Sequence, residues 1–356
     1  MNVELLSSDP LDHSSPLLVL PVLQGTTDLK GALEAADEAV GGALQRALEG
    51  GDFTGKAEET LLFFPSGESG PRRILLVGMG KAGEVSAETL RRIGGKGVRA
   101  AEGARQEEMA FWMDSSIPLE VPLAAQAVTE GCVLAAWRFD ELKTQEDAET
   151  PTTEVTRLTL IHQGEEAEAR MGMGIGLAQA RGENVARTLQ ARPGNIATPT
   201  HLAEEAKRMG KELGLAVTIL GPKEMRAQEM GALLAVAQGS EQEPRLIVLE
   251  HRGGEKGEAP LVLVGKGLTF DAGGISIKPA SGMEDMKYDM SGGAAVLGAM
   301  HAVAELSLPL NVVGVVPSSE NLLSGRAVKP GDVIRTREGK TVEIINTDAE
   351  GRLILA

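Results

Sequence analysis

Four acidic side chains in the last third of the chain stand among glycines and small residues, where no surface role is evident. They are Asp271, Asp289, Asp348 and Glu350. Carboxylates that converge away from water repel one another and lose hydration unless they bind protons or cations. A divalent metal meets this need, and four carboxylates suit two ions better than one. We therefore predict a two-metal centre, for which hard oxygen ligands favour Mg²⁺ or Mn²⁺ and also accept Zn²⁺.

The spacing of these residues indicates how they could meet. Lys266 and Asp271 follow an apolar run at residues 261–264, and open α/β sheets place their ligands just beyond strand ends. Asp289 precedes a predicted helix, whose positive N-terminus favours negative charge. Asp348 and Glu350 are separated by one residue, so an extended segment would turn both carboxylates to the same side.

Two lysines, Lys266 and Lys278, lie within the same stretches. A neutral lysine can bind a metal when desolvation and nearby dications depress its pKa, whereas a charged lysine can polarise a substrate carbonyl. Spacing alone leaves both assignments open.

Two other features of the sequence could indicate a functional site, the histidines and a glycine-rich motif, but we favour a structural role for both. Its five histidines are scattered and form no H-E-x-x-H motif, so surface or core positions suit them better than metal ligation. Gly78-Met-Gly-Lys-Ala-Gly83 fits the dinucleotide-binding pattern G-x-G-x-x-G. No acidic residue ends a second strand about 20 positions later, so a tight turn between a strand and a helix is the favoured interpretation.

Composition limits the class of protein. A chain of 356 residues is long enough for two domains, and its net charge of -16 argues against nucleic acid or an anionic membrane as a partner. Cys132 is the only cysteine, so no internal disulfide is expected. The N-terminus lacks the pattern of a signal peptide, and no apolar run approaches the ~18 residues that span a bilayer. We predict a cytoplasmic protein.

Strands alternate with helices along the whole sequence, which is typical of α/β folds. In the first half, apolar patterns predict strands at 17–22, 61–64, 74–77 and 155–162 and helices at 30–48, 84–93 and 128–137. A long glycine-containing helix at 165–190 follows. In the second half they predict helices at 201–213, 223–230 and 294–306, buried strands at 215–220, 246–249, 261–264 and 310–316, a hairpin turning at Glu338-Gly339, and a last strand at 342–345.

The predicted organisation is a smaller N-terminal α/β domain at 1–163, a linker helix at 164–191, and an α/β catalytic domain with a mixed central sheet at 192–356. The polar stretch at 141–153 is the best candidate for a domain edge.

Three motifs resemble those of the leucine aminopeptidase family of cytosolic two-metal exopeptidases. They are Val264-Gly-Lys-Gly-Leu-Thr-Phe-Asp271, Met286-Lys-Tyr-Asp-Met-Ser-Gly-Gly293 and Asn346-Thr-Asp-Ala-Glu-Gly-Arg352. The third motif is highly specific to this family. Weaker similarity at 192–199, 327–332 and 130–144 extends the resemblance over most of the chain. The resemblance implies a metal-dependent aminopeptidase that releases N-terminal amino acids, preferring leucine and other apolar residues, from peptides with a free N-terminus.

The resemblance also implies a role for each matching position. Asp271 and Glu350 would bridge two metal ions, Mn²⁺ or Zn²⁺. Lys266 and Asp289 would complete the tighter site, and Asp348 the more exchangeable one. Lys278 would polarise the scissile carbonyl and stabilise the oxyanion. Arg352 would hold a bicarbonate ion as general base, since a guanidinium grips a planar oxyanion bidentately. Met286 would line the pocket for the first side chain.

Family members continue well beyond the Arg352 motif, so we expect the catalytic domain to be incomplete at its C-terminus. The resemblance implies a homohexamer for the complete protein. Two rival functions are a truncated, inactive member with a structural or assembly role, and another two-metal hydrolase such as a phosphoesterase. The intact ligand set opposes the first. The second class usually recruits histidines, which the three motifs lack.

Overall fold

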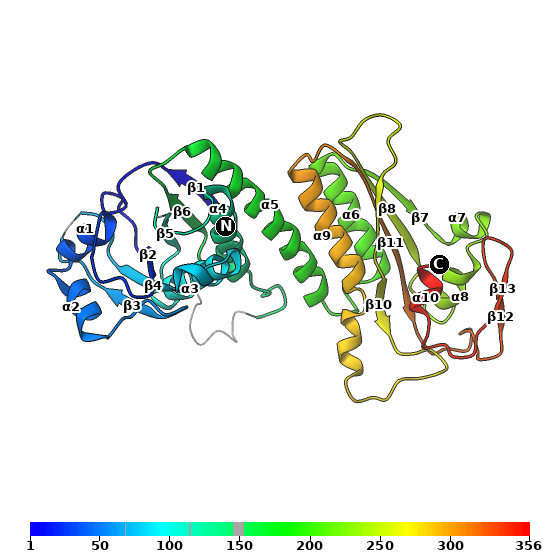
Figure 1. Cartoon of the computed structure of the whole chain (residues 1–356). Helices are drawn as coiled ribbons and strands as arrows, with labels where there is room; N and C mark the ends of the chain where they lie inside the picture. Colours follow the sequence, from blue (N-terminus) through cyan, green and yellow to red (C-terminus); the bar gives the residue numbers. More distant parts are fainter. Residues whose placement is uncertain (68, 114, 145–152) are drawn as a thin grey trace. The chain divides into compact units, whose positions relative to one another are not determined.

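The computed structural model describes residues 1–67, 69–113, 115–144 and 153–356 (Figure 1). These residues form two compact units, Met1–Ala180 and Arg181–Ala356, and the boundary falls within the long helix α5 (Glu166–Ala191). Most of the polar stretch at 141–153, predicted as a domain edge, lies outside the described residues.

The first unit is built on a sheet with strand order β1-β6-β5-β2-β4-β3, in which all neighbours are parallel except β3 and β4. Its strands are β1 (Asn2–Leu6), β2 (Leu18–Leu23), β3 (Thr60–Phe63), β4 (Ile74–Gly80), β5 (Glu108–Trp112) and β6 (Arg157–Ile161). Its helices before α5 are α1 (Ala32–Ala39), α2 (Ala43–Gly50), α3 (Ala87–Gly103) and α4 (Val121–Ala136), with a short 3₁₀ turn, η1 (Ala82–Glu84).

Helices cover both faces of this sheet, which is why β2 is apolar at every position. Val19, together with Leu17 just before the strand, belongs to the core beneath α3 and α4. Leu18 and Leu20 belong to the opposite core, beneath α1 and α2. Successive side chains of a strand point to opposite faces, so a continuous apolar run is expected when both faces are buried.

The predicted single helix at 30–48 is wrong. The chain breaks between α1 and α2 at Gly41 and Gly42, whose φ angles of 64° and 79° lie in the left-handed region. Helix α3 is longer than the predicted 84–93, and α4 begins well before the predicted 128. Strands β1 and β5 were not predicted.

The second unit contains a mixed sheet with strand order β10-β11-β8-β7, to which β9 adds beside β11. Its strands are β7 (Ala216–Leu220), β8 (Arg245–Arg252), β9 (Leu261–Val264), β10 (Gly267–Asp271) and β11 (Asn311–Asn321). β9 and β10 pair in parallel with successive parts of β11, whereas β8 is antiparallel to it. A separate hairpin joins β12 (Val333–Arg335) to β13 (Thr341–Glu343). The predicted mixed sheet is confirmed.

Helices flank this sheet on both sides (Figure 1). α6 (Pro199–Leu213) and α9 (Ser291–Glu305) pack with the end of α5 against one face. α7 (Pro222–Ala227), α8 (Gly231–Ala237) and α10 (Gly351–Ile354) pack on the other. A 3₁₀ segment, η3 (Met283–Tyr288), precedes α9. Neither α8 nor β10 was predicted.

Two expectations for the strands of this unit need correction. The run at 261–264 forms β9, but Leu261, Val262 and Val264 are more than half exposed, because β11 is the only strand paired with β9 among the described residues. The last strand is also shorter than the predicted 342–345, since β13 ends at Glu343 and leaves the chain free to turn.

Three glycines of α5, Gly172, Gly176 and Gly182, are explained by close helix crossings. A Cβ atom at Gly172 or Gly176 would lie 2.0 Å or 2.4 Å from backbone oxygens of α4. In the second unit, a Cβ at Gly182 would lie 2.4 Å from the carbonyl oxygen of Gly298 in α9. Glycine is unfavourable within a helix. Here that cost is offset because the backbone of α5 can approach those of α4 and α9 more closely than side chains would allow. Among the described residues, no helix has both the length and the apolar character needed to cross a bilayer.

Candidate metal centre

Asp271 is the last residue of β10, and the glycines after it allow the chain to fold back on itself. Gly273 and Gly274 have φ angles of 85° and 66°, which glycine adopts without steric cost. The Lys278 amide then donates to the Ala272 carbonyl over 3.0 Å. This closed loop brings Asp271 and Lys278 to one point at the carboxyl end of the strand.

The second acidic segment, 346–350, does not form the extended stretch that the sequence suggested. It turns at Thr347 and Asp348, where the Asp348 amide donates to Oδ1 of Asn346 over 2.8 Å. Asparagine side chains commonly stabilise turns in this way. The turn still directs Asp348 and Glu350 toward Asp271.

One carboxylate oxygen from each of Asp271, Asp348 and Glu350 lies within 4.8 Å of the others. Asp271 and Glu350 are each only 2% exposed, so their charges are largely removed from water. The group unites the end of β10 with the loop before α10, which are distant in the sequence.

Lys266 connects this group to the fourth acidic residue. Its Nζ lies 2.8 Å from Oδ2 of Asp289 and 2.8 Å from Oε1 of Glu350. Asp289 lies between η3 and α9, and the Gly293 amide at the start of α9 donates to the Lys266 carbonyl over 2.6 Å. The helix start therefore holds Lys266 and Asp289 side by side.

Lys278 pairs with the other two carboxylates. Its Nζ lies 2.9 Å from Oδ2 of Asp271 and 2.5 Å from Oδ1 of Asp348. Each lysine thus joins one carboxylate from the 346–350 segment to one from elsewhere, and two ammonium groups neutralise part of the charge of four carboxylates.

Burial and ion pairing act in opposite directions on the pKa values of these groups. Desolvation favours the neutral form of both lysines, but their carboxylate partners outweigh it, so the pKa of Lys266 and the pKa of Lys278 are both raised. Desolvation raises the pKa of Asp289, and its ion pair with Lys266 only partly opposes the shift. Both lysines are therefore cationic in the metal-free protein.

The residues of the cluster fit divalent metal ions. The donor set is dominated by carboxylate oxygens, which Mn²⁺ and Mg²⁺ prefer and Zn²⁺ accepts. Glu350 Oε2 is buried and has no hydrogen-bond partner among the described residues. A buried charged oxygen without a partner is costly, and a cation bound beside it would remove that cost.

Two of the predicted site residues stand apart from these ion pairs. Arg352 lies in the first turn of α10, is exposed, and pairs with no carboxylate in the described part of the chain. Met286 lies in η3 and is half-buried. The other predicted residues converge: Lys266, Asp271, Lys278, Asp289, Asp348 and Glu350.

Buried polar residues next to the cluster were not recognised from the sequence. Asn321 and Thr347 are each 3% exposed, and the Asn321 amide lies 2.8 Å from Oδ1 of Asp271. The signal was the polar run Ser318-Ser-Glu-Asn321 directly after an apolar strand. The predicted strand ended at residue 316, so this run was not placed on β11.

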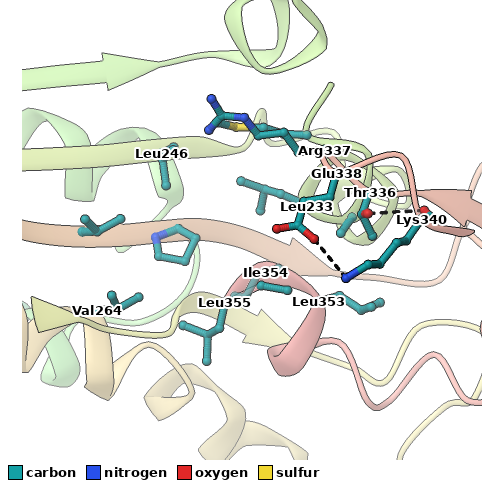
Figure 2. A pocket seen from close by; sticks show the side chains of 15 residues that line it. Leu233, Leu246, Val264, Thr336, Arg337, Glu338, Lys340, Leu353, Ile354 and Leu355 are labelled. Atoms are coloured by element: carbon teal, nitrogen blue, oxygen red, sulfur yellow. Dashed lines mark hydrogen bonds and ion pairs between the residues drawn. The ribbon is translucent and has the colours of Figure 1, made fainter. Parts of the chain in front are cut away.

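An apolar hollow of about 650 Å³ lies elsewhere in the second unit (Figure 2). Leu233, Leu246, Val264, Leu353 and Leu355 are among the residues that line it. None of the predicted site residues lines it, so Met286 is not part of this hollow.

Comparisons with known proteins identify the family of the chain. Residues 184–356 match the family described as the cytosol aminopeptidase family, catalytic domain, and residues 19–146 match the N-terminal domain of the same family. The chain belongs to the cytosol aminopeptidase family. The predicted resemblance is confirmed, and with it the assignment of the chain to a family of metal-dependent peptidases.

Curated relatives match along nearly the whole chain. The probable cytosol aminopeptidase of Acidithiobacillus ferrooxidans is 43% identical over 360 residues, covering 100% of this chain and 72% of the relative. That of Alkalilimnicola ehrlichii is 44% identical over 348 residues, covering 96% of this chain and 69% of the relative. The chain thus spans about 70% of the length of each of these aminopeptidases.

Solved structures support the same fold. A mutant of tomato leucine aminopeptidase is 29% identical, with a TM-score of 0.85 over 99% of this chain and 69% of that one. The bottromycin maturation enzyme BotP in complex with Mn is 28% identical, with a TM-score of 0.80 over 96% of this chain and 67% of that one. The predicted two-domain α/β architecture of this aminopeptidase-family chain is confirmed.

Proposed function

We propose that this chain carries the centre of a two-metal aminopeptidase that releases N-terminal amino acids, leucine and other apolar residues preferred, from peptides with a free N-terminus. The observation that carries the proposal is the convergence of Asp271, Asp348 and Glu350 within 4.8 Å. Family membership supports peptide hydrolysis. The buried Oε2 atom of Glu350, which has no hydrogen-bond partner in the described part of the chain, supports a bound cation.

Five side chains would hold the two ions: Lys266, Asp271, Asp289, Asp348 and Glu350. When bound, two divalent ions acidify water and polarise a substrate carbonyl. Asp271 and Glu350 are the most buried of these carboxylates, and both would contact the two ions. Lys266 lies between Asp289 and Glu350, so it must leave these ion pairs and lose its proton to act as a ligand.

The remaining roles belong to Lys278, Arg352 and Met286. The Lys278 ammonium is paired with Asp271 and Asp348, and it would donate to the developing oxyanion of the scissile carbonyl. Arg352 is exposed and unpaired within the described residues, so its guanidinium is available to hold a bicarbonate ion as general base. Met286 would contact the first side chain of the substrate.

We further propose Mn²⁺ or Zn²⁺ as the ions, the cytoplasm as the location, and a homohexamer as the assembly of the complete protein. A neighbouring structure described with Mn supports manganese. The domain bounds proposed from the sequence remain 1–163, 164–191 and 192–356.

The test is hydrolysis of a leucyl chromogenic amide by the purified chain with added Mn²⁺ or Zn²⁺. We expect metal-dependent hydrolysis that Glu350→Gln abolishes and that Lys278→Met lowers by about 10²–10³-fold in kcat. A phosphate-ester substrate should not be cleaved. Cleavage of the phosphate ester alone would favour another two-metal hydrolase. Metal binding without any hydrolysis would favour an inactive member with a structural role.

A further inference from the structure

Asn321 and Asp271 end two neighbouring parallel strands at partner positions. β10 ends at Asp271 and β11 ends at Asn321, and the two residues are paired in the register of the strands. The Asn321 side-chain amide donates to Oδ1 of Asp271 over 2.8 Å and to the Thr347 carbonyl over 3.0 Å. One amide therefore contacts both segments that supply the central carboxylates.

These contacts determine which oxygen of Asp271 faces the cluster. Oδ1 also accepts a hydrogen bond from the Gly273 amide over 2.9 Å, so it has two donors that belong to the protein. Oδ2 lies on the other side, 2.9 Å from Nζ of Lys278. A carboxylate held in this way presents a single oxygen, Oδ2, to a cation in the cluster.

Thr347 joins the 346–350 segment to the 271–278 loop by hydrogen bonds. Its hydroxyl donates to the Gly273 carbonyl over 2.6 Å and accepts from the Ser276 amide over 2.8 Å. The Thr347 amide donates to the Ser276 hydroxyl over 3.2 Å. Because Thr347 directly precedes Asp348, these bonds fix the 346–350 segment against the 271–278 loop.

Gly274 shows how closely these groups approach one another. A Cβ atom there would lie 2.8 Å from Oδ1 of Asn321 and 3.1 Å from Oγ1 of Thr347. Asn321 and Thr347 are almost fully buried, so water has little access to replace either partner. The hydrogen bonds of Asn321 and Thr347 therefore leave no room for a side chain at Gly274 and little for water.

We propose that Asn321 is a positioning residue of the metal centre, which holds Asp271 so that Oδ2 alone faces the ions and couples this ligand to Asp348 and Glu350 through Thr347. The inference rests on the proposed function. Hydrogen-bond partners of metal ligands typically set metal affinity by about 10–100-fold. Asn321 contacts no metal itself and acts through Asp271.

The experiment compares Asn321→Leu, which keeps the approximate size of the side chain but removes the donor, with a matched control on the same strand. Asn311 begins β11, and its amide likewise bridges two carbonyls, those of Glu255 and Glu258, over 3.0 Å and 3.2 Å. Asn311→Leu therefore removes a similar bridge outside the cluster. The affinity for Mn²⁺ is measured by competition with a chelator, on protein shown by circular dichroism to be folded.

We expect Asn321→Leu to weaken Mn²⁺ binding by about 10–100-fold and Asn311→Leu to leave it within about twofold of the unmodified chain. Asn321→Ala, which leaves a small void and no donor, replaces the leucine variant if the latter does not fold. Equal Mn²⁺ affinity in the folded Asn321 variant and the unmodified chain would overturn the positioning role alone. Failure of the unmodified chain to bind Mn²⁺ would overturn the proposed function and this inference with it.

Discussion

Nζ of Lys266 lies 2.8 Å from Oε1 of Glu350, a residue 84 positions later in the chain. This ion pair, together with that between Lys266 and Asp289, places an ammonium group among the carboxylates that we propose as metal ligands. The lysine and the metal therefore depend on the same carboxylates. Without metal, the Lys266 ammonium neutralises part of the carboxylate charge. In the metal-bound protein, the ions would neutralise that charge instead.

Replacing Lys266 with methionine should destabilise the metal-free protein. The change leaves the buried carboxylate of Glu350 without its cation, and breaking a fully buried pair costs roughly 3–5 kcal/mol. Because Lys266 retains about a quarter of its side-chain exposure, we expect a loss of about 2 kcal/mol. Urea unfolding in the presence of EDTA measures the free energy of unfolding. An unchanged value would show that the ion pair does not stabilise the cluster.

A side chain at Gly273 should be unfavourable for two reasons, the left-handed backbone angle and the lack of space around it. A Cβ atom at Gly273 would lie 2.5 Å from the Ser276 carbonyl oxygen and 3.0 Å from Oδ1 of Asp348. At Gly339, which has a φ of 80°, no atom of the described ranges lies within 4 Å of an added Cβ atom. Gly339→Ala should cost about 1 kcal/mol for its left-handed conformation, whereas Gly273→Ala should cost more and also weaken Mn²⁺ binding.

Thermal unfolding and Mn²⁺ titration of these two alanine variants provide the comparison. Equal losses of stability, with Mn²⁺ affinity unaffected in both, would mean that the 271–278 loop tolerates the added methyl group.

Two glycines of α5 should respond in opposite directions to alanine. Gly182→Ala places a methyl group 2.4 Å from the Gly298 carbonyl oxygen, and overpacking of this kind typically costs about 1–3 kcal/mol. Gly174 is exposed, and no atom of the residues that the structure describes lies within 4 Å of the added Cβ atom. Gly174→Ala should therefore stabilise the protein by up to about 1 kcal/mol. Urea unfolding of both variants is the test, and the same sign for both would contradict the crossing of α5 and α9.

His301 should make the second unit less stable in mild acid. Burial lowers its pKa below the ordinary value, although Glu305 opposes the shift. A lowered pKa in the folded state means that the neutral form stabilises the fold above the unfolded pKa, about 6.5, and that this stability is lost as the pH falls below it. Between pH 7.5 and 5.5 the unmodified protein should lose more stability than His301→Gln. Parallel losses would exclude this contribution.

The sequence predicted which residues converge more completely than it predicted how the backbone brings them together. Asp271 and Glu350 were recognised because buried carboxylates among glycines need a cation. The two-residue spacing of Asp348 and Glu350 suggested an extended segment, whereas a turn capped by Asn346 brings them to the cluster. Spacing describes only neighbours within one segment, and the convergence depends on the long-range pairing of β10 with β11.

Other differences have similarly local causes. Gly41 and Gly42 divided a predicted helix because their left-handed φ angles interrupt an apolar pattern that otherwise continues. β10 was missed because its residues include glycine and the charged Asp271, which do not follow the usual strand pattern. Asn321 was missed because its importance comes from contacts with Asp271 and Thr347, and neither contact is visible in the sequence around it.

The number of Mn²⁺ ions bound by the purified chain tests the central claim most directly. Isothermal titration and electron paramagnetic resonance should detect two bound ions per chain, and an Asp271→Asn, Glu350→Gln double variant that remains folded should bind neither tightly. Absence of Mn²⁺ binding by the folded unmodified chain, or unchanged binding by the double variant, would contradict the assignment of these carboxylates as the metal centre.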